Sequence, residues 1–431
     1  MSRSKVLALI LAGGEGGRLS VLTEQRAKPA MPYAGVYRLI DFALSNCMHS
    51  QLSDVWVIEQ YLPHSLNDHL ANGRPWDLDR TYGGLQVLSP YTSRGANDDE
   101  SGFAEGNADA IYRNKSLIRE FAPDILLVLS ADHIYQLDFR DVIEQHITRK
   151  AEVTMVTTKV PLEDASRYGT VKVNRRERVT SFDYKPERPK SNLVTTEVFV
   201  YDAHKLLETL ERLAAEGTKQ KGGKSKKSSK DGGNGAGATL KDFGHKLLPH
   251  LVSEGRAYEY RFDGYWRDVG TVESYWQSHM DLLAPEPALN LDDPQWAILT
   301  YGNQRIPARI HTSARIENSL IAPGCVVRGH VVRSVLAPGV VIEEGASVYD
   351  SILFHDVLIE AGAVINNAIL DERVRIGRGA AVGGQSGIEG QSKPQPKDIP
   401  KITLIGRDLQ IEAGGKVRAG THLEPEDDRQ G

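Results

Sequence analysis

The chain contains few cysteines and has no large excess of positive or negative charge. Its 431 residues include only two cysteines, Cys47 and Cys325, which lie far apart and fit neither a disulfide framework nor a metal-ligand spacing. A reduced compartment is therefore the simpler expectation. The formal net charge of −5 lacks the basic footprint expected of a protein that binds nucleic acid or an anionic membrane, so we expect neither partner.

Long hydrophobic runs are also missing. The apolar run at residues 6–12 passes directly into glycines and is too short for a signal peptide or a membrane span. We therefore expect a cytoplasmic protein. A chain of 431 residues is long for one domain, and two domains are the natural expectation.

The most informative stretch is a short apolar run that leads into a glycine-dense turn with two cations. Leu11 and Ala12 precede Gly13 and Gly14, and Arg18 and Lys28 follow. Glycines let the backbone approach an anion closely, so the pattern is typical of a strand that delivers N–H groups and cations to a nucleoside triphosphate. The spacing matches neither a P-loop nor a dinucleotide-binding fingerprint. The alternative is an ordinary strand-to-helix turn.

Residues 1–281 alternate apolar strands with amphipathic helical stretches. Helical patterns cover Ala108–Phe121 and Phe139–Lys150, and the strand candidates are Val6–Leu11, Val55–Ile58, Ile125–Leu129, Val153–Val160 and Val198–Tyr201. This order predicts an α/β fold with a mostly parallel, Rossmann-like sheet covered by helices on both faces. Because ligands bind at the carboxyl ends of such strands, the Gly13 turn and the segment Ser130–His133 should be neighbours in space.

The segment Thr218–Ala238 interrupts this pattern with lysines among glycines and serines. Without large apolar side chains it cannot offset the entropy cost of ordering, so we expect a solvated, disordered loop. An anion-binding role is the less favoured alternative, because charge runs are usually solvated surface.

The C-terminal part carries an internal repeat. The triplets Ser334–Leu336, Ser351–Leu353 and Ala368–Leu370 recur at equal spacing, and aliphatic residues follow each triplet in six-residue steps. This period is typical of a parallel β-helix. We therefore predict a catalytic domain at 1–281, a connector at 282–308 and a β-helix domain at 309–431.

Two carboxylates and a lysine are candidates for chemistry. Asp132 directly follows the most apolar strand, which suits a Mg²⁺ ligand beside a triphosphate, although it could instead cap a following helix. Asp268 offers a second carboxylate, or forms a surface pair with Arg267. Lys185 lies before a proline and taken alone would be a solvated side chain. No nucleophile–histidine spacing is present, and phosphoryl chemistry needs none.

The sequence closely resembles bacterial glucose-1-phosphate adenylyltransferases, which are sugar nucleotidyltransferases. The segments that carry the resemblance are Leu11–Leu19, Arg26–Ala30, Arg38–Asn46, Gln60–Tyr61, Gly106–Ala110, Ala131–Tyr135, Lys185–Pro186, Asp242–Gly244 and Trp266–Thr271. The period-six region resembles the left-handed β-helix domain of that family.

The resemblance implies that a sugar 1-phosphate attacks the α-phosphorus of ATP and expels diphosphate, supplying glucan synthesis of the glycogen or starch type. It implies catalytic roles for Arg18, Lys28 and Asp132, and Mg²⁺ held by Asp132 and Asp268. The implied nucleotide-binding residues are Leu11, Ala12, Gly13, Gly14, Gln60 and Gly106. The implied sugar-phosphate residues are Gly169, Tyr184, Lys185 and Thr195. The family also forms homotetramers and responds to allosteric metabolites.

Several positions depart from the family pattern. Gly17, Ala104 and Tyr184 replace a threonine, a tyrosine and a glutamate, Gln25 replaces an activator lysine, and the adenine loop differs around Thr92-Ser93. The triplet Thr195-Thr196-Glu197 also replaces Ser-Met-Gly. The sequence therefore leaves the sugar specificity and the base specificity undecided. A catalytically weak regulatory subunit is the alternative hypothesis. An acyltransferase on the β-helix is the weakest alternative, because His330 and His355 lack a supporting motif.

Overall fold

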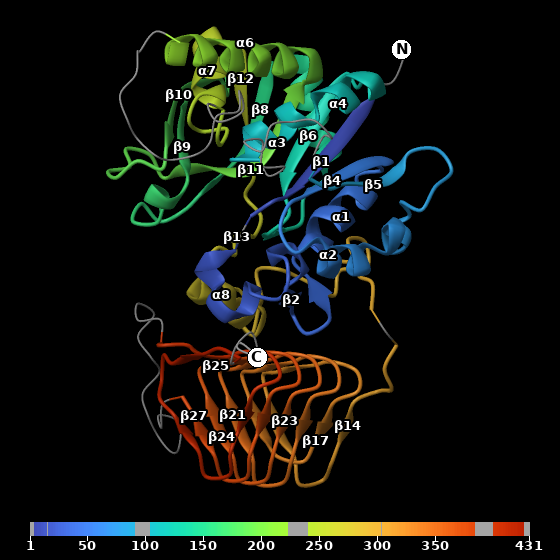
Figure 1. Cartoon of the computed structure of the whole chain (residues 1–431), viewed down its shortest axis with the longest axis vertical. Helices are drawn as coiled ribbons and strands as arrows, with labels where there is room; N and C mark the ends of the chain where they lie inside the picture. The colour runs from blue at the N-terminus through green and yellow to red at the C-terminus, as the bar shows by residue number, and fades with distance from the viewer. Residues whose placement is uncertain are drawn as a thin grey trace.

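The computed structural model describes residues 4–14, 16–90, 104–222, 240–302, 304–383 and 400–425, with side chains in the third range described to residue 216. An α/β part and a β-helix lie one above the other, with α8 (Val272–Leu282) and β2 (Pro32–Tyr33) between them (Figure 1). No helix among the described residues is long and apolar enough to cross a bilayer.

The central sheet combines parallel and antiparallel strands. β1 (Val6–Ala12) lies between β4 (Asp54–Glu59) and β6 (Ile125–Ser130), all parallel, and β5 (Gly84–Leu88) continues the parallel edge. β11 (Leu193–Asp202) runs antiparallel to β6. The predicted strands are present, but the antiparallel course of β11 near the middle of the sheet is not predicted by the sequence pattern.

The remaining strands of this part extend the sheet beyond β11 or form short ribbons. β8 and β9 both pair antiparallel with β11, β12 pairs parallel with β8, and β10 pairs antiparallel with β9. Their bounds are β8 (Val153–Lys159), β9 (Gly169–Val173), β10 (Val179–Tyr184) and β12 (Ala257–Arg261). Two ribbons pair β2 with β3 (Tyr37–Arg38) and β7 (His133–Tyr135) with β13 (Trp266–Asp268).

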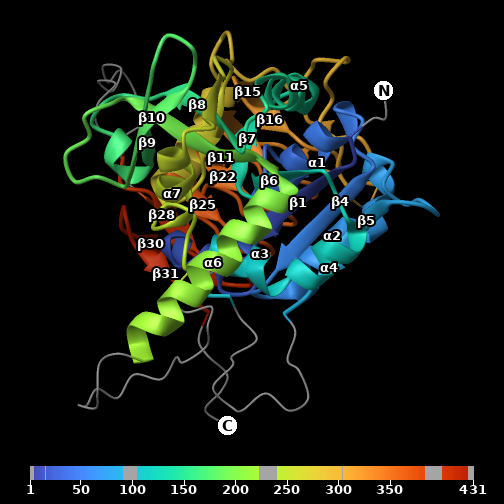
Figure 2. The same cartoon turned by 90° about the horizontal axis from the view of Figure 1, so that it is seen from above.

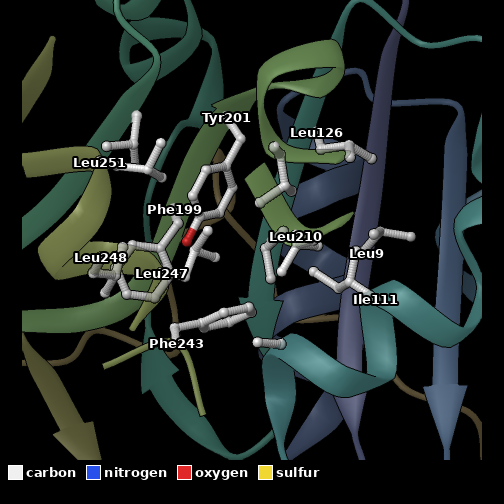
Figure 3. Close-up of a cluster of buried hydrophobic side chains, with 14 of the residues drawn as sticks. Leu9, Ile111, Leu126, Phe199, Tyr201, Leu210, Phe243, Leu247, Leu248 and Leu251 are labelled. Carbon is white, nitrogen blue, oxygen red and sulfur yellow. The ribbon is translucent and has the colours of Figure 1, made fainter. Parts of the chain in front are cut away.

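Helices cover both faces of the sheet. Alternate residues of β1 point to opposite faces, and all are apolar, so each face packs against a layer of helices. Leu7 and Leu9 pack with α3, α6 and α7, whereas Ala8 and Ile10 pack with α1 and α5. Figure 3 shows Leu9 in the first of these clusters. Figure 2 places β6 and β1 between these two helix layers. The helices are α1 (Ile40–His49), α2 (Pro63–Leu70), α3 (Asn107–Arg113), α4 (Lys115–Phe121), α5 (Phe139–Arg149), α6 (Ala203–Gly222) and α7 (Leu247–Glu254). The short 3₁₀ helices are η1 (Gly17–Thr23), η2 (Lys28–Ala30), η3 (Ala71–Trp76) and η4 (Ala165–Arg167).

Two helix predictions need correction. The pattern at Ala108–Phe121 forms two helices, α3 and α4, because the chain leaves helical geometry at Asn114, whose amide donates to the Ala110 carbonyl at 2.9 Å. The segment predicted as a loop at Thr218–Ala238 begins inside α6, which runs to Gly222. Lysine and glutamine favour helix, so α6 continues into the lysine run. Residues 223–238 of that prediction lie outside the described residues.

The C-terminal part is a left-handed parallel β-helix, as predicted. Its described strands form three parallel sheets of six, one on each side of the coil. The first sheet contains β14 (Arg309–Ile310), β17 (Val326–Val327), β20 (Val341–Ile342), β23 (Leu358–Ile359), β26 (Arg375–Ile376) and β29 (Gln410–Ile411). The second contains β15 (Arg315–Glu317), β18 (His330–Val332), β21 (Ser347–Tyr349), β24 (Val364–Asn366), β27 (Ala381–Val382) and β30 (Lys416–Val417). The third contains β16 (Leu320–Ile321), β19 (Val335–Leu336), β22 (Ile352–Leu353), β25 (Ala368–Leu370), β28 (Thr403–Ile405) and β31 (His422–Leu423).

The repeat seen in the sequence becomes a stack of aliphatic side chains. Leu336, Leu353 and Leu370 lie in register on successive strands and are fully buried. The six-residue step places one aliphatic residue per side of the triangular coil in the interior, so each coil buries its apolar surface against the next.

The α/β part and the β-helix share a core. Tyr275 and Trp276 of α8 pack in one cluster with Phe354 and Ile369 of the β-helix, and the Trp276 indole N–H donates to the Asp350 carbonyl at 2.7 Å. Burial of this apolar surface fixes the two parts against each other.

Candidate functional site

The glycine-rich turn and the segment Ser130–His133 are neighbours, as the sheet order predicts. Leu11 of β1 lies in register with Ser130 of β6, and the Ala131 N–H donates to the Leu11 carbonyl at 3.2 Å. Both segments leave the carboxyl edge of the sheet at adjacent strands. Gly16 in the turn has φ +75°, a conformation that glycine adopts without steric cost.

A cavity of about 200 Å³ opens above this edge. Its lining brings together most of the predicted nucleotide-binding residues: Leu11, Gly13, Gly14, Gln60 and Gly106. A Cβ at Gly13 would lie 2.9 Å from the Gln60 side-chain nitrogen, and one at Gly106 would lie 2.5 Å from the Lys241 backbone. Glycine is therefore required sterically at position 106, where the neighbour is backbone, whereas at Gly13 the Gln60 side chain would have to move. Ala12, the last residue of β1, is buried beneath the turn.

Asp132 and Asp268 converge on one buried histidine. His133 Nε2 lies 3.7 Å from Asp132 Oδ1 and 3.6 Å from Asp268 Oδ1. The β7–β13 ribbon creates this arrangement, because it pairs Asp268 directly with His133. Lys28 forms an ion pair with Asp132 from the other side.

These neighbours set the ionisation of the cluster. Burial alone would raise the pKa of the Asp132 carboxyl, but Lys28 and His133 hold that pKa below its ordinary value, so the group stays ionised. Burial would lower the pKa of His133, yet Asp132, Glu197 and Asp268 together raise it. The negative charges of Asp132 and Asp268 are thus balanced by the nearby Lys28 and His133.

Arg18 reaches the same edge from η1. A Cβ at Gly270 would lie 3.3 Å from Arg18 Nη2 and 3.1 Å from Asp268 Oδ1, so the guanidinium and the carboxylate flank this glycine. Arg18 is exposed at the surface, where an anionic ligand can reach it. Two cations, Arg18 and Lys28, therefore border the two carboxylates.

The predicted sugar-phosphate residues line a second, adjoining cavity. Gly169, Tyr184, Lys185 and Thr195 all face it, and Glu197 joins them. The Thr195 hydroxyl donates to the Gly169 carbonyl at 3.4 Å, and the Lys185 N–H donates to the Tyr168 carbonyl at 3.1 Å. These two hydrogen bonds, together with the strand pairing, hold β9, β10 and β11 together as one wall of the cavity.

Asp242 joins the two cavities. It lines both of them, receives the Tyr184 hydroxyl hydrogen bond at 2.9 Å and accepts the Asn107 N–H at 3.3 Å. Burial and the nearby Asp242 carboxylate raise the pKa of Tyr184, so the phenol keeps its proton. Asn107 follows Gly106 at the start of α3, so this one carboxylate fixes the spacing between the two cavities.

Comparison with known proteins agrees with this geometry. The nucleotidyl transferase family matches residues 7–232 and 233–284, and the GlmU-like C-terminal hexapeptide family matches 305–391. A glucose-1-phosphate adenylyltransferase of Pseudothermotoga lettingae is 43% identical over 80% of this chain and 76% of its own length. That of Acetivibrio thermocellus is 36% identical over 99% of this chain and 94% of its own. The chain belongs to the glucose-1-phosphate adenylyltransferase family.

Nucleotidyltransferases of this family generally use a divalent metal ion. In the described part of the chain, no group of three or more histidine, cysteine or acidic side chains is arranged to hold a metal. The two-carboxylate set of Asp132 and Asp268 still fits Mg²⁺, which takes one or two carboxylates and completes its shell with water and phosphate oxygens.

The structure decides two alternatives left open by the sequence. Asp132 caps no helix, because β7 follows it and α5 starts at Phe139 with Asp138 as its cap. Asp268 does not form the predicted surface pair with Arg267, because the Arg267 guanidinium pairs with Asp281. Both carboxylates therefore remain directed toward the site.

Three contributors escaped the sequence analysis as site residues: His133, Asp242 and Glu197. Each lies in or beside a quoted motif, but its position depends on strand pairing and packing that no local pattern contains. Burial raises the pKa of Glu197, and Asp132 and Asp268 add to this effect. Ala104 lines the nucleotide cavity, whereas Thr92-Ser93 lies outside the described residues.

Proposed function

We propose that this chain catalyses adenylyl transfer from ATP to α-D-glucose 1-phosphate, which forms ADP-glucose and diphosphate for glucan synthesis. The observation that carries the proposal is the pair Asp132 and Asp268 around His133, bordered by Arg18 and Lys28 and set between two adjoining cavities. Residues 1–281 would form the catalytic domain, 282–308 the connector and 309–431 the β-helix domain.

ATP would occupy the cavity lined by Gly13, Gly14, Gln60 and Gly106. The close backbone at Gly13 and Gly106 suits a flat base and a phosphate chain, and the Gln60 amide can both donate to and accept from a base edge. Arg18 and Lys28 would bind the triphosphate. Their positive charge offsets the repulsion that builds up as a second phosphate approaches.

Asp132 and Asp268 would hold Mg²⁺ against the phosphates. When bound, such an ion polarises the phosphoryl oxygens and neutralises charge that develops on them. Lys28, which pairs with Asp132 in the structure, would then be able to pair with the triphosphate of ATP instead. The ion pair seen between Lys28 and Asp132 thus keeps the carboxylate ionised until substrates arrive.

Glucose 1-phosphate would occupy the second cavity. Lys185 would bind its phosphate as a point charge, while Gly169, Thr195 and Tyr184 border the sugar ring. A phosphate oxygen of this substrate then attacks the α-phosphorus of ATP in line with the departing diphosphate. Positioning and charge neutralisation supply the catalysis, so no covalent intermediate with the protein is required.

The alternative of a catalytically weak regulatory subunit is disfavoured by the same charges. A subunit without catalytic work has no physical reason to keep Asp132 and Asp268 close together against their mutual repulsion. The decisive assay follows diphosphate release with four nucleoside triphosphates and several sugar 1-phosphates. Fastest turnover with ATP and glucose 1-phosphate is expected, and no turnover with any pair would favour the regulatory subunit.

We further propose that an anionic metabolite regulates the enzyme from a cavity of about 1130 Å³ between the α/β part and the β-helix. Arg38, Arg305 and Arg407 line it, and Arg38 Nη1 is buried without a hydrogen-bond partner among the described residues. An unpaired buried donor favours an anion. Gln25 also lines the cavity, so the activator need not be a sugar bisphosphate.

A homotetramer is the assembly we propose. β14, β15 and β16 are the end strands of the three β-helix sheets, so among the described residues each pairs with a strand on one side only. Ile306 and Ile310, in this first coil, are 73% and 50% exposed. Such an apolar edge favours burial against another chain. Light scattering of the full chain tests this, and a stable monomer at micromolar concentration would contradict it.

A further inference from the structure

Glu197 occupies an irregular point of the sheet beside the sugar cavity. β11 pairs with β8 at Thr195 opposite Thr157 and resumes at Phe199 opposite Met155, so extra residues bulge out of β11 between these pairs. β-bulges next to active sites redirect a side chain that regular pairing would place elsewhere. Here the redirected residue is Glu197, which lines the sugar cavity.

The bulge is held from the side of the acidic cluster. The Thr196 carbonyl accepts a hydrogen bond from His133 Nδ1 at 3.0 Å, and the Thr196 hydroxyl donates to the Val156 carbonyl at 3.1 Å. Thr196 is itself buried. The position of Glu197 is therefore determined by the surrounding structure.

The backbone at Glu197 is strained. Its φ is +56°, in the left-handed region that side chains other than glycine rarely adopt. Strain of this kind persists where surrounding structure holds it, and it gathers at binding sites. Lys185, across the same cavity, also has positive φ, at +44°. Two strained charged residues thus face one cavity.

The Glu197 carboxylate has no hydrogen-bond partner among the described residues. Its ion-pair contact among these residues is with His133, whose Nε2 lies 4.0 Å from Oε2, and its side chain keeps 43% of its surface exposed. Two hydroxyls that line the cavity already donate within the protein, that of Tyr184 to Asp242 and that of Thr195 to the Gly169 carbonyl. Both carboxylate oxygens of Glu197 can therefore still accept a hydrogen bond from a ligand in the cavity.

We propose that Glu197 is a sugar-specificity residue, whose carboxylate accepts hydrogen bonds from ring hydroxyls of a hexose 1-phosphate bound with its phosphate on Lys185. The inference rests on the proposed function and names a contact within its sugar site. A carboxylate is an acceptor only, so it suits the hydroxyl donors of a polyol ring, whereas like charge disfavours its contact with inorganic phosphate. A phosphate on Lys185 would place the attached ring in the cavity that Glu197 lines.

The test compares Glu197→Gly and Glu197→Gln with the wild type. Substrates are glucose 1-phosphate and its 2-, 3-, 4- and 6-deoxy analogues, with kcat and KM measured for the sugar and for ATP. Gln51→Gly is the matched control, because Gln51 also has positive φ, at +58°, and its exposed side chain lies in the loop after α1. Both glycine variants relieve strain, but only one removes the carboxylate.

We expect Glu197→Gly to lower kcat/KM for glucose 1-phosphate by about 10- to 100-fold, as loss of a charge-assisted hydrogen bond does, with KM for ATP unchanged. At least one deoxy analogue should have a lower kcat/KM than glucose 1-phosphate in the wild type and in Gln51→Gly, but not in Glu197→Gly. Equal penalties in all proteins would overturn the proposal. So would a rise in the KM of ATP that matches the rise for the sugar.

A binding measurement separates this inference from the proposed reaction. Thermal shifts are recorded with glucose 1-phosphate, its deoxy analogues and inorganic phosphate. If the wild type transfers no adenylyl group yet binds glucose 1-phosphate more tightly than phosphate, and Glu197→Gly abolishes the difference, the inference stands and the proposed function fails. If the wild type binds both equally, the inference is wrong.

Discussion

Asp371→Ala should destabilise the protein far more than removal of a surface carboxylate. Arg26, on the segment before η2, donates to Asp371 in the β-helix through Nη2 at 2.7 Å and through Nη1 at 3.1 Å. Both side chains are almost fully buried, with 4% and 3% of their surface exposed. Truncation of Asp371 would leave a buried guanidinium without its bidentate partner.

The size of the effect follows from this burial. Removing one partner of a buried ion pair costs about 3–5 kcal/mol. Glu372 Oε1, 3.3 Å from the same Arg26 nitrogen, retains part of the attraction. We therefore expect about 3 kcal/mol, at the lower end of that range. Arg26→Met combined with Asp371→Leu should recover most of the loss, because neither charge of this buried pair remains and Glu372 keeps Arg407 as its partner.

The assay is urea unfolding of the full chain, with Asp408→Ala as the control. Arg373 and Asp408 form an equally bidentate pair, at 2.5 and 2.6 Å, but are 51% and 55% exposed. Exposed pairs contribute less than about 1 kcal/mol. A loss of stability in Asp371→Ala no greater than that in Asp408→Ala would contradict this prediction, as would a double variant less stable than Asp371→Ala. Burial would then not set the loss of unfolding free energy at this ion pair.

Three further predictions concern the site and the acid stability of the fold. Asp132→Asn should lower kcat at least about a hundredfold at saturating Mg²⁺ with the fold intact, because the amide lacks the charge that a metal requires; activity within tenfold of wild type would remove Asp132 from the site. Lys185→Ala should raise KM for glucose 1-phosphate by orders of magnitude and spare that for ATP, and equal effects on both would refute its role. Burial lowers the pKa of His279 from 6.5 to about 4, and its Nε2 accepts the Ala34 N–H at 3.1 Å, so the ring is neutral in the folded state. The stability this provides is complete above pH 6.5 and is lost as pH falls through 4, by about 3 kcal/mol; His279→Asn should flatten the unfolding free energy measured across that range.

Much of the fold could be predicted because its signals are local. Short continuous apolar runs predict β1 and β6, and the six-residue step of aliphatic residues predicts the β-helix. The antiparallel course of β11 could not be predicted, since strand direction depends on a connection through β9 and β10. The break at Asn114 was missed because a single residue leaving helical geometry hardly changes the apolar pattern.

The candidate site was predictable to the extent that sheet topology brings strand ends together. Gly13 and Asp132 follow adjacent parallel strands, so their proximity follows from strand order alone. The position of Asp268 depends on the β7–β13 ribbon, and that of Glu197 on a bulge. Both arise from long-range pairing, which a single sequence does not encode in its spacing. The roles assigned to these residues stay predictions until the variants are measured.

The most direct test of the proposed reaction follows the α-phosphorus of ATP. The full chain is incubated with glucose 1-phosphate, Mg²⁺ and ATP labelled either at the α- or at the γ-phosphorus, and the products are separated. Adenylyl transfer predicts that α-label appears in ADP-glucose and γ-label in diphosphate, with both products formed at least about a hundredfold more slowly by Asp132→Asn. Transfer of γ-label to the sugar phosphate, or the absence of labelled nucleotide sugar, would contradict the account.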